Sequence, residues 1–331
     1  MPKKTDYLYA TARVRALEAS LLNEDRMERM LAAKTNDEAV KVLSECGYGG
    51  VPISTPSDIE KAIASERAKV YELLDKISAD KNLVDVMKIK YDYHNIKVII
   101  KTKEKEENSH LFIDAGRVKP FKLEEFIRES KYADLNDIMS AAIIEAKDVL
   151  SRTNDPQLSD FILDKACLAE MKNAAKETKS AFLIGYIKFL IDMTNLRAFI
   201  RCSRMGKNSD FLKYAVIEGG GIDTKNLLFA VNDANFKAES IYSGTDLENA
   251  ATVGESCLHG EKTLTMFEKI CDDALMTYLR KAKYISFGEE PVFAYLAAKE
   301  AEFTAVRTIL AGRLSRLSPE MIRERLRITY V

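Results

Sequence analysis

Apolar positions recur in the same helical pattern at three places along the chain. The stretches 91–100, 191–200 and 301–310 carry apolar residues at four matching positions. At about 100° per residue these positions form a stripe roughly 120° wide on one helix face. The residues of the stripe are Tyr93, Ile96, Ile99 and Ile100, then Met193, Leu196, Phe199 and Ile200, and finally Phe303, Val306, Ile309 and Leu310. This recurrence predicts one helical unit written three times.

The polar positions of the three stretches also match. An acid is followed three residues later by Asn or Ala, and two residues after that by a base. The repeated polar residues are Asp92, Asn95 and Lys97, then Asp192, Asn195 and Arg197, and then Glu302 and Arg307, with Ala305 in place of Asn. Acid and base are five residues apart, so they do not form an ordinary ion pair within one helix. We interpret these residues as structural repeat positions that meet partners on neighbouring helices.

The three acids have a second interpretation, in which they serve catalysis or ion transport. Acids at equivalent positions of three units more often pair with basic neighbours or helix ends, because buried carboxylates need partners. His94 lies in the first copy, where the sister copies have Thr194 and Thr304. That replacement favours a structural position over a catalytic one.

Helix-start signals recur in step with the motif. The stretches 35–38, 57–60 and 245–248 have the pattern of a capping box, and 134–137 takes the corresponding place in the second unit. Asp155-Pro156 and Ser318-Pro319 are further helix starts. The span from cap residue to motif acid differs by only one residue among Thr35–Asp92, Asp134–Asp192 and Thr245–Glu302.

We therefore expect an all-α protein of three similar helical domains in a closed pseudo-threefold arrangement, with long antiparallel helical hairpins. The predicted units are 1–107, 108–206 and 207–331, the last with a C-terminal helix. The tripeptide Gly219-Gly-Gly221 near the start of the third unit is interpreted as a hinge.

Composition narrows the class of protein. Seven prolines and no Trp among 331 residues favour long helices, and 50 basic against 51 acidic residues give no bias toward nucleic acid. The five cysteines lack any Cys-x-x-Cys pair, which indicates reduced thiols in a cytoplasmic protein. The longest apolar run, 181–191, is short and interrupted by Lys188, so no direct membrane span is predicted.

No motif for chemistry is found. The stretch 254–263 resembles a phosphate-binding loop but has five residues between its glycines, and Glu261 separates Gly260 from Lys262. The three histidines are far apart and lack metal-ligand spacing. No catalytic residue, cofactor or metal site is therefore predicted, and the chain is interpreted as a scaffold or coupling element.

The pattern resembles the C subunit of the V/A-type rotary ATPases, the counterpart of the d subunit in eukaryotic V-ATPases. The resemblance covers essentially the whole chain. It rests on the opening residues 7–18, on the Asp-x-x-Asn repeats at Asp92 and Asp192, and on the ending residues 322–331. Ala305 departs from the Asn of the first two repeats.

The resemblance implies a funnel-like arrangement of the three domains. It also implies a non-catalytic rotor component at the cytoplasmic face of a membrane, peripheral and without a cofactor. It would join the D and F subunits of the central stalk to the membrane proteolipid (c-type) ring. ATP hydrolysis or synthesis in other subunits would thereby be linked to transport of H⁺ or Na⁺. Bases near the unit ends are candidate docking residues, namely Lys101, Lys103, Arg201 and Arg204.

Two other classes stay open at this point. One is a stand-alone helical adaptor or scaffold protein, unrelated to rotary motors. The other is a helical enzyme whose site is built from residues that are not adjacent in sequence. A deep pocket with strongly perturbed acids would favour the enzyme.

Overall fold

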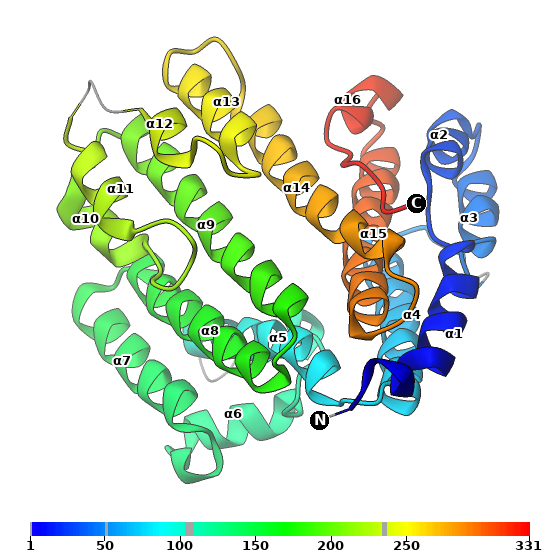
Figure 1. Ribbon diagram of the computed structural model, residues 1–331, viewed down its shortest axis with the longest axis horizontal. Helices are drawn as coiled ribbons and strands as arrows, with labels where there is room; N and C mark the ends of the chain where they lie inside the picture. The colour runs from blue at the N-terminus through cyan, green and yellow to red at the C-terminus, as the bar shows by residue number, and fades with distance from the viewer. Residues whose placement is uncertain (1, 50–51, 103–108, 234–236) are drawn as a thin grey trace. The chain divides into compact units, whose positions relative to one another are not determined.

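The computed structural model describes residues 2–49, 52–102, 109–233 and 237–331 (Figure 1). Helices make up 74% of the structure and the described residues include no strand, which confirms the all-α class. Two compact units are present, one of residues 1–84 with 244–331 and one of residues 85–243. The predicted boundary at 107/108 lies outside the described residues, and the division into three domains stays a prediction.

The first unit is formed by both ends of the chain. Its α-helices are α1 (Leu8–Glu18), α2 (Glu24–Ala32), α3 (Asn36–Ser44), α4 (Pro56–Ile77), α13 (Glu248–Leu258), α14 (Leu264–Arg280), α15 (Glu289–Leu314) and α16 (Pro319–Arg323). Short 3-10 helices lie at Lys4–Tyr7 and Lys281–Tyr284.

Helix α15 is the centre of the first unit and contains the third copy of the motif. It packs against α1, α2, α3, α4, α14 and α16, so the N-terminal and C-terminal helices lie side by side (Figure 1). Arg313 near the end of α15 donates to the backbone carbonyls of Met30 and Leu31 over 3.0 and 3.1 Å. These carbonyls belong to the last turn of α2, which has no further helical partner for them. A side chain near the C-terminal end of the sequence thus pairs the last backbone carbonyls of a helix near its N-terminal end.

The second unit contains the first two copies of the motif, on α5 and α9. Its α-helices are α5 (Asn82–Lys101), α6 (Pro120–Arg128), α7 (Asp137–Thr153), α8 (Pro156–Thr178), α9 (Ala181–Arg204), α10 (Ser209–Ala215), α11 (Thr224–Ala230) and α12 (Ala238–Tyr242). Helix α5 begins in the last residues of the first unit and lies otherwise in the second. Helix α8 packs against α7, α9 and α10, and 3-10 helices lie at Ser109–Leu111 and Tyr132–Asp134.

The predicted apolar stripes are buried. Eleven of the twelve positions have side chains in the core, and Ile100 is half-buried. Ile96, Leu196 and Val306, the central position of each copy, are fully buried at 0% exposure. The helical spacing of apolar residues in the sequence therefore marks the face on which each motif helix packs.

Several helix starts differ from the sequence prediction. Helix α4 begins two residues early, because Thr55 and Asp58 form the capping box with Pro56 in the first turn. The N-cap of α7 is Asn136, and α13 begins after Leu247 without a side-chain cap. The near-constant span from cap to motif acid is correspondingly less uniform than the sequence suggested. The caps at Thr35, Asp155 and Ser318 are confirmed.

Candidate functional site

Each motif acid binds the backbone of a segment that leads into a short helix. The donor is each time the residue just before the N-cap of α6, α11 or α2. The contacts are Val118 N to Asp92 Oδ1 at 3.1 Å, Ile222 N to Asp192 Oδ1 at 3.0 Å, and Leu22 N to Glu302 Oε2 at 2.7 Å. We call residues 113–118, 217–222 and 17–22 the lead-in segments. A carboxylate that accepts a backbone N–H fixes where the following helix begins.

The connectivity of these contacts is cyclic. Asp92 and Asp192 bind the lead-in segment that follows each of them along the chain. Glu302 binds the first lead-in segment, 280 residues earlier in the sequence. The last motif helix therefore holds the start of the first repeat.

The two motif asparagines hold the first residue of their lead-in segments. Asn95 donates to the Ile113 carbonyl and accepts from the Ile113 N–H, each over 2.9 Å. Asn195 makes the same two bonds to Ile217, each over 2.8 Å. Both asparagines are fully buried, and buried backbone groups need hydrogen-bond partners. Each Asn amide therefore pairs both the N–H and the C=O of its isoleucine.

Lys97 and Arg307, the motif bases of the first and third copies, meet acids on long neighbouring helices. Lys97 Nζ lies 2.6 Å from Asp164 Oδ1 on α8. Arg307 donates twice to Glu60 on α4, over 2.5 and 2.8 Å. Arg197 is half-buried on α9.

A buried charge cluster surrounds Asp92 in the second unit. Arg117 Nε donates to Asp92 over 2.9 Å, and its Nη2 donates to Glu170 on α8 over 2.5 Å. Tyr93 donates its hydroxyl to the same Glu170 over 2.9 Å. Burial lowers the pKa of Arg117, but Glu170 and Asp92 together raise it above its ordinary value. The guanidinium therefore stays charged and joins the motif helix to α8.

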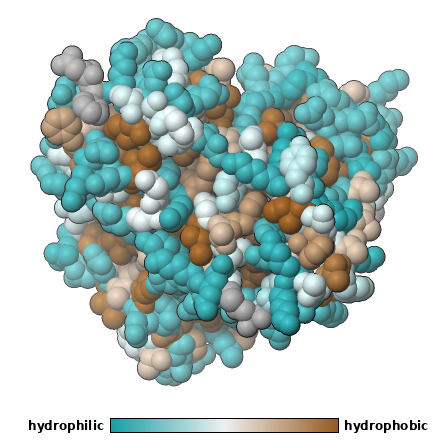
Figure 2. Space-filling view, viewed as in Figure 1, coloured by the Kyte–Doolittle hydropathy of each residue, from teal (hydrophilic) through white to brown (hydrophobic). Residues whose placement is uncertain are grey.

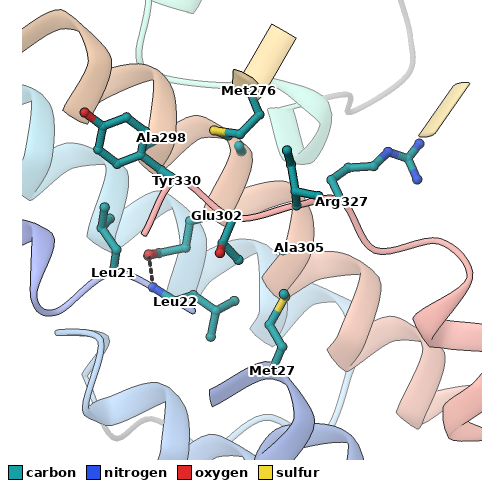
Figure 3. A pocket seen from close by; sticks show the side chains of 12 residues that line it. Leu21, Leu22, Met27, Met276, Ala298, Glu302, Ala305, Arg327 and Tyr330 are labelled. Carbon is teal, nitrogen blue, oxygen red and sulfur yellow. Dashed lines mark hydrogen bonds between the residues drawn. The ribbon is translucent and has the colours of Figure 1, made fainter. Parts of the chain in front are cut away.

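A corresponding cluster surrounds Glu302 in the first unit, with the cation on the motif helix itself. Lys299 Nζ lies 2.7 Å from Glu302 and 3.0 Å from Glu66 on α4. Tyr48 donates its hydroxyl to Glu302 over 2.9 Å. Figure 3 shows the Glu302 carboxylate turned toward the Leu22 N–H. Both clusters thus place one cation between a motif acid and an acid of a long helix.

Asp192 lacks such a hydrogen-bonded cation among the described contacts and rests on backbone donors. Gly221 donates to its Oδ2 over 2.7 Å, in addition to the bond from Ile222. Burial raises the pKa of Asp192, and these two bonds and the charge of Lys188 oppose the rise. Gly220 and Gly221 therefore lie against a carboxylate of their own chain, and the interpretation of the tripeptide as a hinge stays a prediction.

Sequence reasoning missed the partners of the motif residues. Arg117, Lys299 and Tyr48 belong to no repeated pattern, so nothing in the sequence marks them. Gly116 and Gly220 gave a usable signal, since each lies two residues before an N–H donor.

The proposed docking bases differ in their surroundings. Lys101 pairs with Asp160 at 3.0 Å. Arg201 and Arg204 are exposed, and Lys103 lies outside the described residues.

The acids stand in an environment suited to packing rather than chemistry. The cavity beside Glu302 has a volume of about 30 Å³, which is room for about one water molecule. Among the residues that the structure describes, no cluster of three or more His, Cys, Asp or Glu is placed to hold a metal ion. None of the described helices combines the length and apolarity needed to cross a bilayer.

The surface is mainly hydrophilic on the face seen in Figure 2, with small scattered hydrophobic patches. Individual apolar side chains are nevertheless well exposed, among them Tyr284 at 91% and Tyr9 at 69%. Ion pairs such as Arg29–Glu45 and Arg323–Glu28 lie on the surface of the first unit.

These features define a helical repeat protein whose repeated pattern of acids, amides and bases serves internal packing. Comparison with known proteins gives the family. The model of the family described as "ATP synthase (C/AC39) subunit" matches residues 10–325, and the chain belongs to this family. Family members are non-catalytic components of V/A-type ATPases, whose catalysis lies in other subunits.

Named relatives match along nearly the whole chain. The C subunit of the V-type sodium ATPase of Enterococcus hirae is 25% identical over 320 residues, covering 96% of this chain and 97% of the relative. The C subunit of the A-type ATP synthase of Methanocaldococcus jannaschii is 27% identical over 348 residues, covering 96% and 85%. That of Thermococcus kodakarensis is 25% identical over 335 residues, covering 97% and 90%.

Proposed function

We propose that this chain is the rotor component that couples the central stalk, with its D and F subunits, to the membrane proteolipid ring. In this role it transmits torque, so that ATP hydrolysis or synthesis is linked to transport of H⁺ or Na⁺. The chain acts at the cytoplasmic face of the membrane as a peripheral part of the complex. The family match over residues 10–325 is the observation that carries the proposal.

The packing within each unit supports a role in transmitting torque. A torque adaptor must resist bending and twisting, and the helices that carry the motif are long, with 20, 24 and 26 residues in α5, α9 and α15. Buried ion clusters tie α5 to α8 through Glu170 and α15 to α4 through Glu66. Buried ionic contacts with satisfied hydrogen bonds restrict how two helices slide past each other.

The cyclic contacts support the proposed threefold arrangement. The motif acid of each repeat binds the lead-in segment of another repeat, and the third repeat binds that of the first. The same contact made three times is what three equivalent domains would show. We therefore retain the predicted domains 1–107, 108–206 and 207–331 as the units of that arrangement.

The test is assembly and coupling of the complex with and without this chain. The subunits of the rotary complex from the same source are co-expressed, with an affinity tag on one of the ATP-hydrolysing subunits. With the chain present, we expect the stalk and proteolipid subunits to co-purify and ATP to drive ion uptake into vesicles. Without it, the catalytic part should still hydrolyse ATP, while ring subunits and ion uptake are lost.

Two results would contradict the proposal. A complete and coupled complex that forms without the chain would show that the chain is not the link. A chain that purifies without stalk or ring subunits, under conditions in which these bind each other, would favour the stand-alone adaptor.

A further inference from the structure

We propose that each motif helix and its lead-in segment form a matched set. In the first match, the length of the motif acid, Asp or Glu, fits the size of the residue that stands two positions before the N–H donor in the lead-in segment. In the second match, the Asn or Ala three residues after the motif acid fits the backbone conformation of the first residue of the lead-in segment. Together these matches decide which lead-in segment each motif helix accepts. The inference concerns the chain's own assembly and does not depend on the partners proposed above.

The first match joins Asp to Gly. A Cβ added at Gly116 would lie 2.1 Å from Asp92 Oδ1, and one added at Gly220 would lie 2.0 Å from Asp192 Oδ1. Neither glycine has a positive φ angle, so the backbone conformation itself admits other residues. Space beside the carboxylate is therefore the reason for glycine at both positions.

The third copy joins Glu to Ser. Ser20 stands two residues before the donor Leu22, where the other lead-in segments have Gly116 and Gly220. Glu302 is longer than Asp by one carbon–carbon bond of about 1.5 Å. Its carboxylate reaches the Leu22 N–H over 2.7 Å without bringing the lead-in backbone against the helix. A side chain at position 20 is thereby tolerated.

The second match joins the amide to a backbone residue that lies outside any helix. Ile113 and Ile217 stand five residues before their donors Val118 and Ile222, and each exchanges both backbone bonds with an Asn. The residue five before Leu22 is Leu17, which lies within α1. Its carbonyl already accepts from the Ser20 N–H over 2.9 Å.

Helical backbone needs no amide partner, which accounts for Ala305 in the third copy. The departure from Asn that the sequence showed at this position thus has a physical reason.

The matches make the third motif helix unlike the other two. A lead-in segment with a non-helical Ile113 or Ile217 would leave the N–H and C=O of that residue facing Ala305, without the amide that pairs them. Two unpaired buried groups are costly. The third motif helix therefore accepts the first lead-in segment and excludes the other two.

The experiment is a double-mutant cycle on the full chain, Glu302→Asp with Ser20→Gly. Thermal unfolding measures stability, and hydrogen exchange measures protection of the Leu22 amide. Glu302→Asp should lower the unfolding midpoint by several degrees and reduce protection of Leu22. Ser20→Gly alone should have a small effect. In the double variant the glycine lets the backbone approach the shorter acid, so both values should return at least halfway toward the wild type.

Glycine variants test the match from the other side. Gly116→Ala and Gly220→Ala should each lower the unfolding midpoint by several degrees, because the new Cβ collides with a carboxylate. Gly49→Ala is the matched control, since a Cβ there meets nothing within 4 Å and its φ angle is not positive. That control should leave the midpoint unchanged or slightly raised.

The outcomes are decisive in both directions. Non-additive recovery in the double variant, with loss at Gly116 and Gly220 but not at Gly49, supports the matched sets. Strictly additive effects of Glu302→Asp and Ser20→Gly would overturn the inference. So would glycine variants at 116 and 220 that unfold at the same midpoint as Gly49→Ala.

Discussion

Replacing Lys299 with Met should be among the most destabilising single changes in the first unit. Lys299 is 2% exposed, and its ammonium lies between Glu302 and Glu66, which are 5% and 7% exposed. Met fills a similar volume but leaves the carboxylates without their shared cation. Removing one partner of a buried ion pair costs about 3–5 kcal/mol, because an uncompensated charge remains buried. For a unit of this size that loss lowers the unfolding midpoint by roughly 6–20 °C.

The pH dependence gives a second signature of the same change. Burial lowers the pKa of Lys299, but Glu302 and Glu66 raise it above its ordinary value. In the wild type the stabilisation is therefore fully present below the ordinary lysine pKa and is lost only as pH rises through the raised value. Lys299→Met lacks this group, so the difference in stability between wild type and variant should shrink as pH rises through the raised pKa of Lys299.

The assay is thermal and urea unfolding, with Lys69→Met as the matched control. Lys69 contacts the same Glu66 at 3.5 Å but is 56% exposed, and exposed pairs contribute at most about 1 kcal/mol. The double variant Lys299→Met with Glu302→Gln should recover part of the loss, since one unpaired charge is removed. Equal midpoints for Lys299→Met and Lys69→Met would refute the reasoning.

Three further changes test the packing of the motif helices. Asn195→Ala should cost about 2–4 kcal/mol in urea unfolding, because it leaves a buried N–H and a buried C=O unpaired. Thr194→Ala, which removes only a bond to the carbonyl of its own helix, should cost less than half as much. An Asp in place of Ile96, Leu196 or Val306 should destabilise its unit by several kcal/mol in thermal denaturation, and no loss would mean that the stripe is not core. Because burial raises the pKa of Asp192, its ionisation costs more in the folded state. Its contribution to stability should therefore fall as pH rises from about 4 through the raised pKa. Urea unfolding at a series of pH values measures this contribution as the difference in free energy of unfolding between wild type and Asp192→Asn. A difference that does not change with pH would contradict the prediction.

The local features of the fold could be predicted from the sequence. Helical periodicity identified the buried face of each motif helix, because a side chain's place on a helix depends only on its neighbours along the chain. The five-residue spacing of acid and base also indicated partners on other helices, and Lys97 and Arg307 do contact acids there. Helix starts were less predictable: Thr55 and Asn136 compete with nearby Ser and Asp residues that can cap equally well.

The partners of the motif acids could not be predicted, because they depend on contacts between distant segments. Glu302 binds Leu22 across 280 residues, and no periodic pattern records such a distance. The close approach of Gly220 and Gly221 to Asp192 was missed for the same reason. A glycine tripeptide permits flexibility and close approach alike, and the local sequence does not record the position of Asp192.

Hydrogen exchange in Glu302→Ala tests the cyclic pairing of the repeats. The wild type, Glu302→Ala and Asp192→Ala are compared by the protection of backbone amides in residues 19–23 and 220–224. We predict that Glu302→Ala loses protection in residues 19–23 and keeps it in 220–224, with the reverse for Asp192→Ala. Loss of protection in Glu302→Ala that is confined to residues 311–331, with residues 19–23 unchanged, would contradict the pairing of the last motif helix with the first lead-in segment.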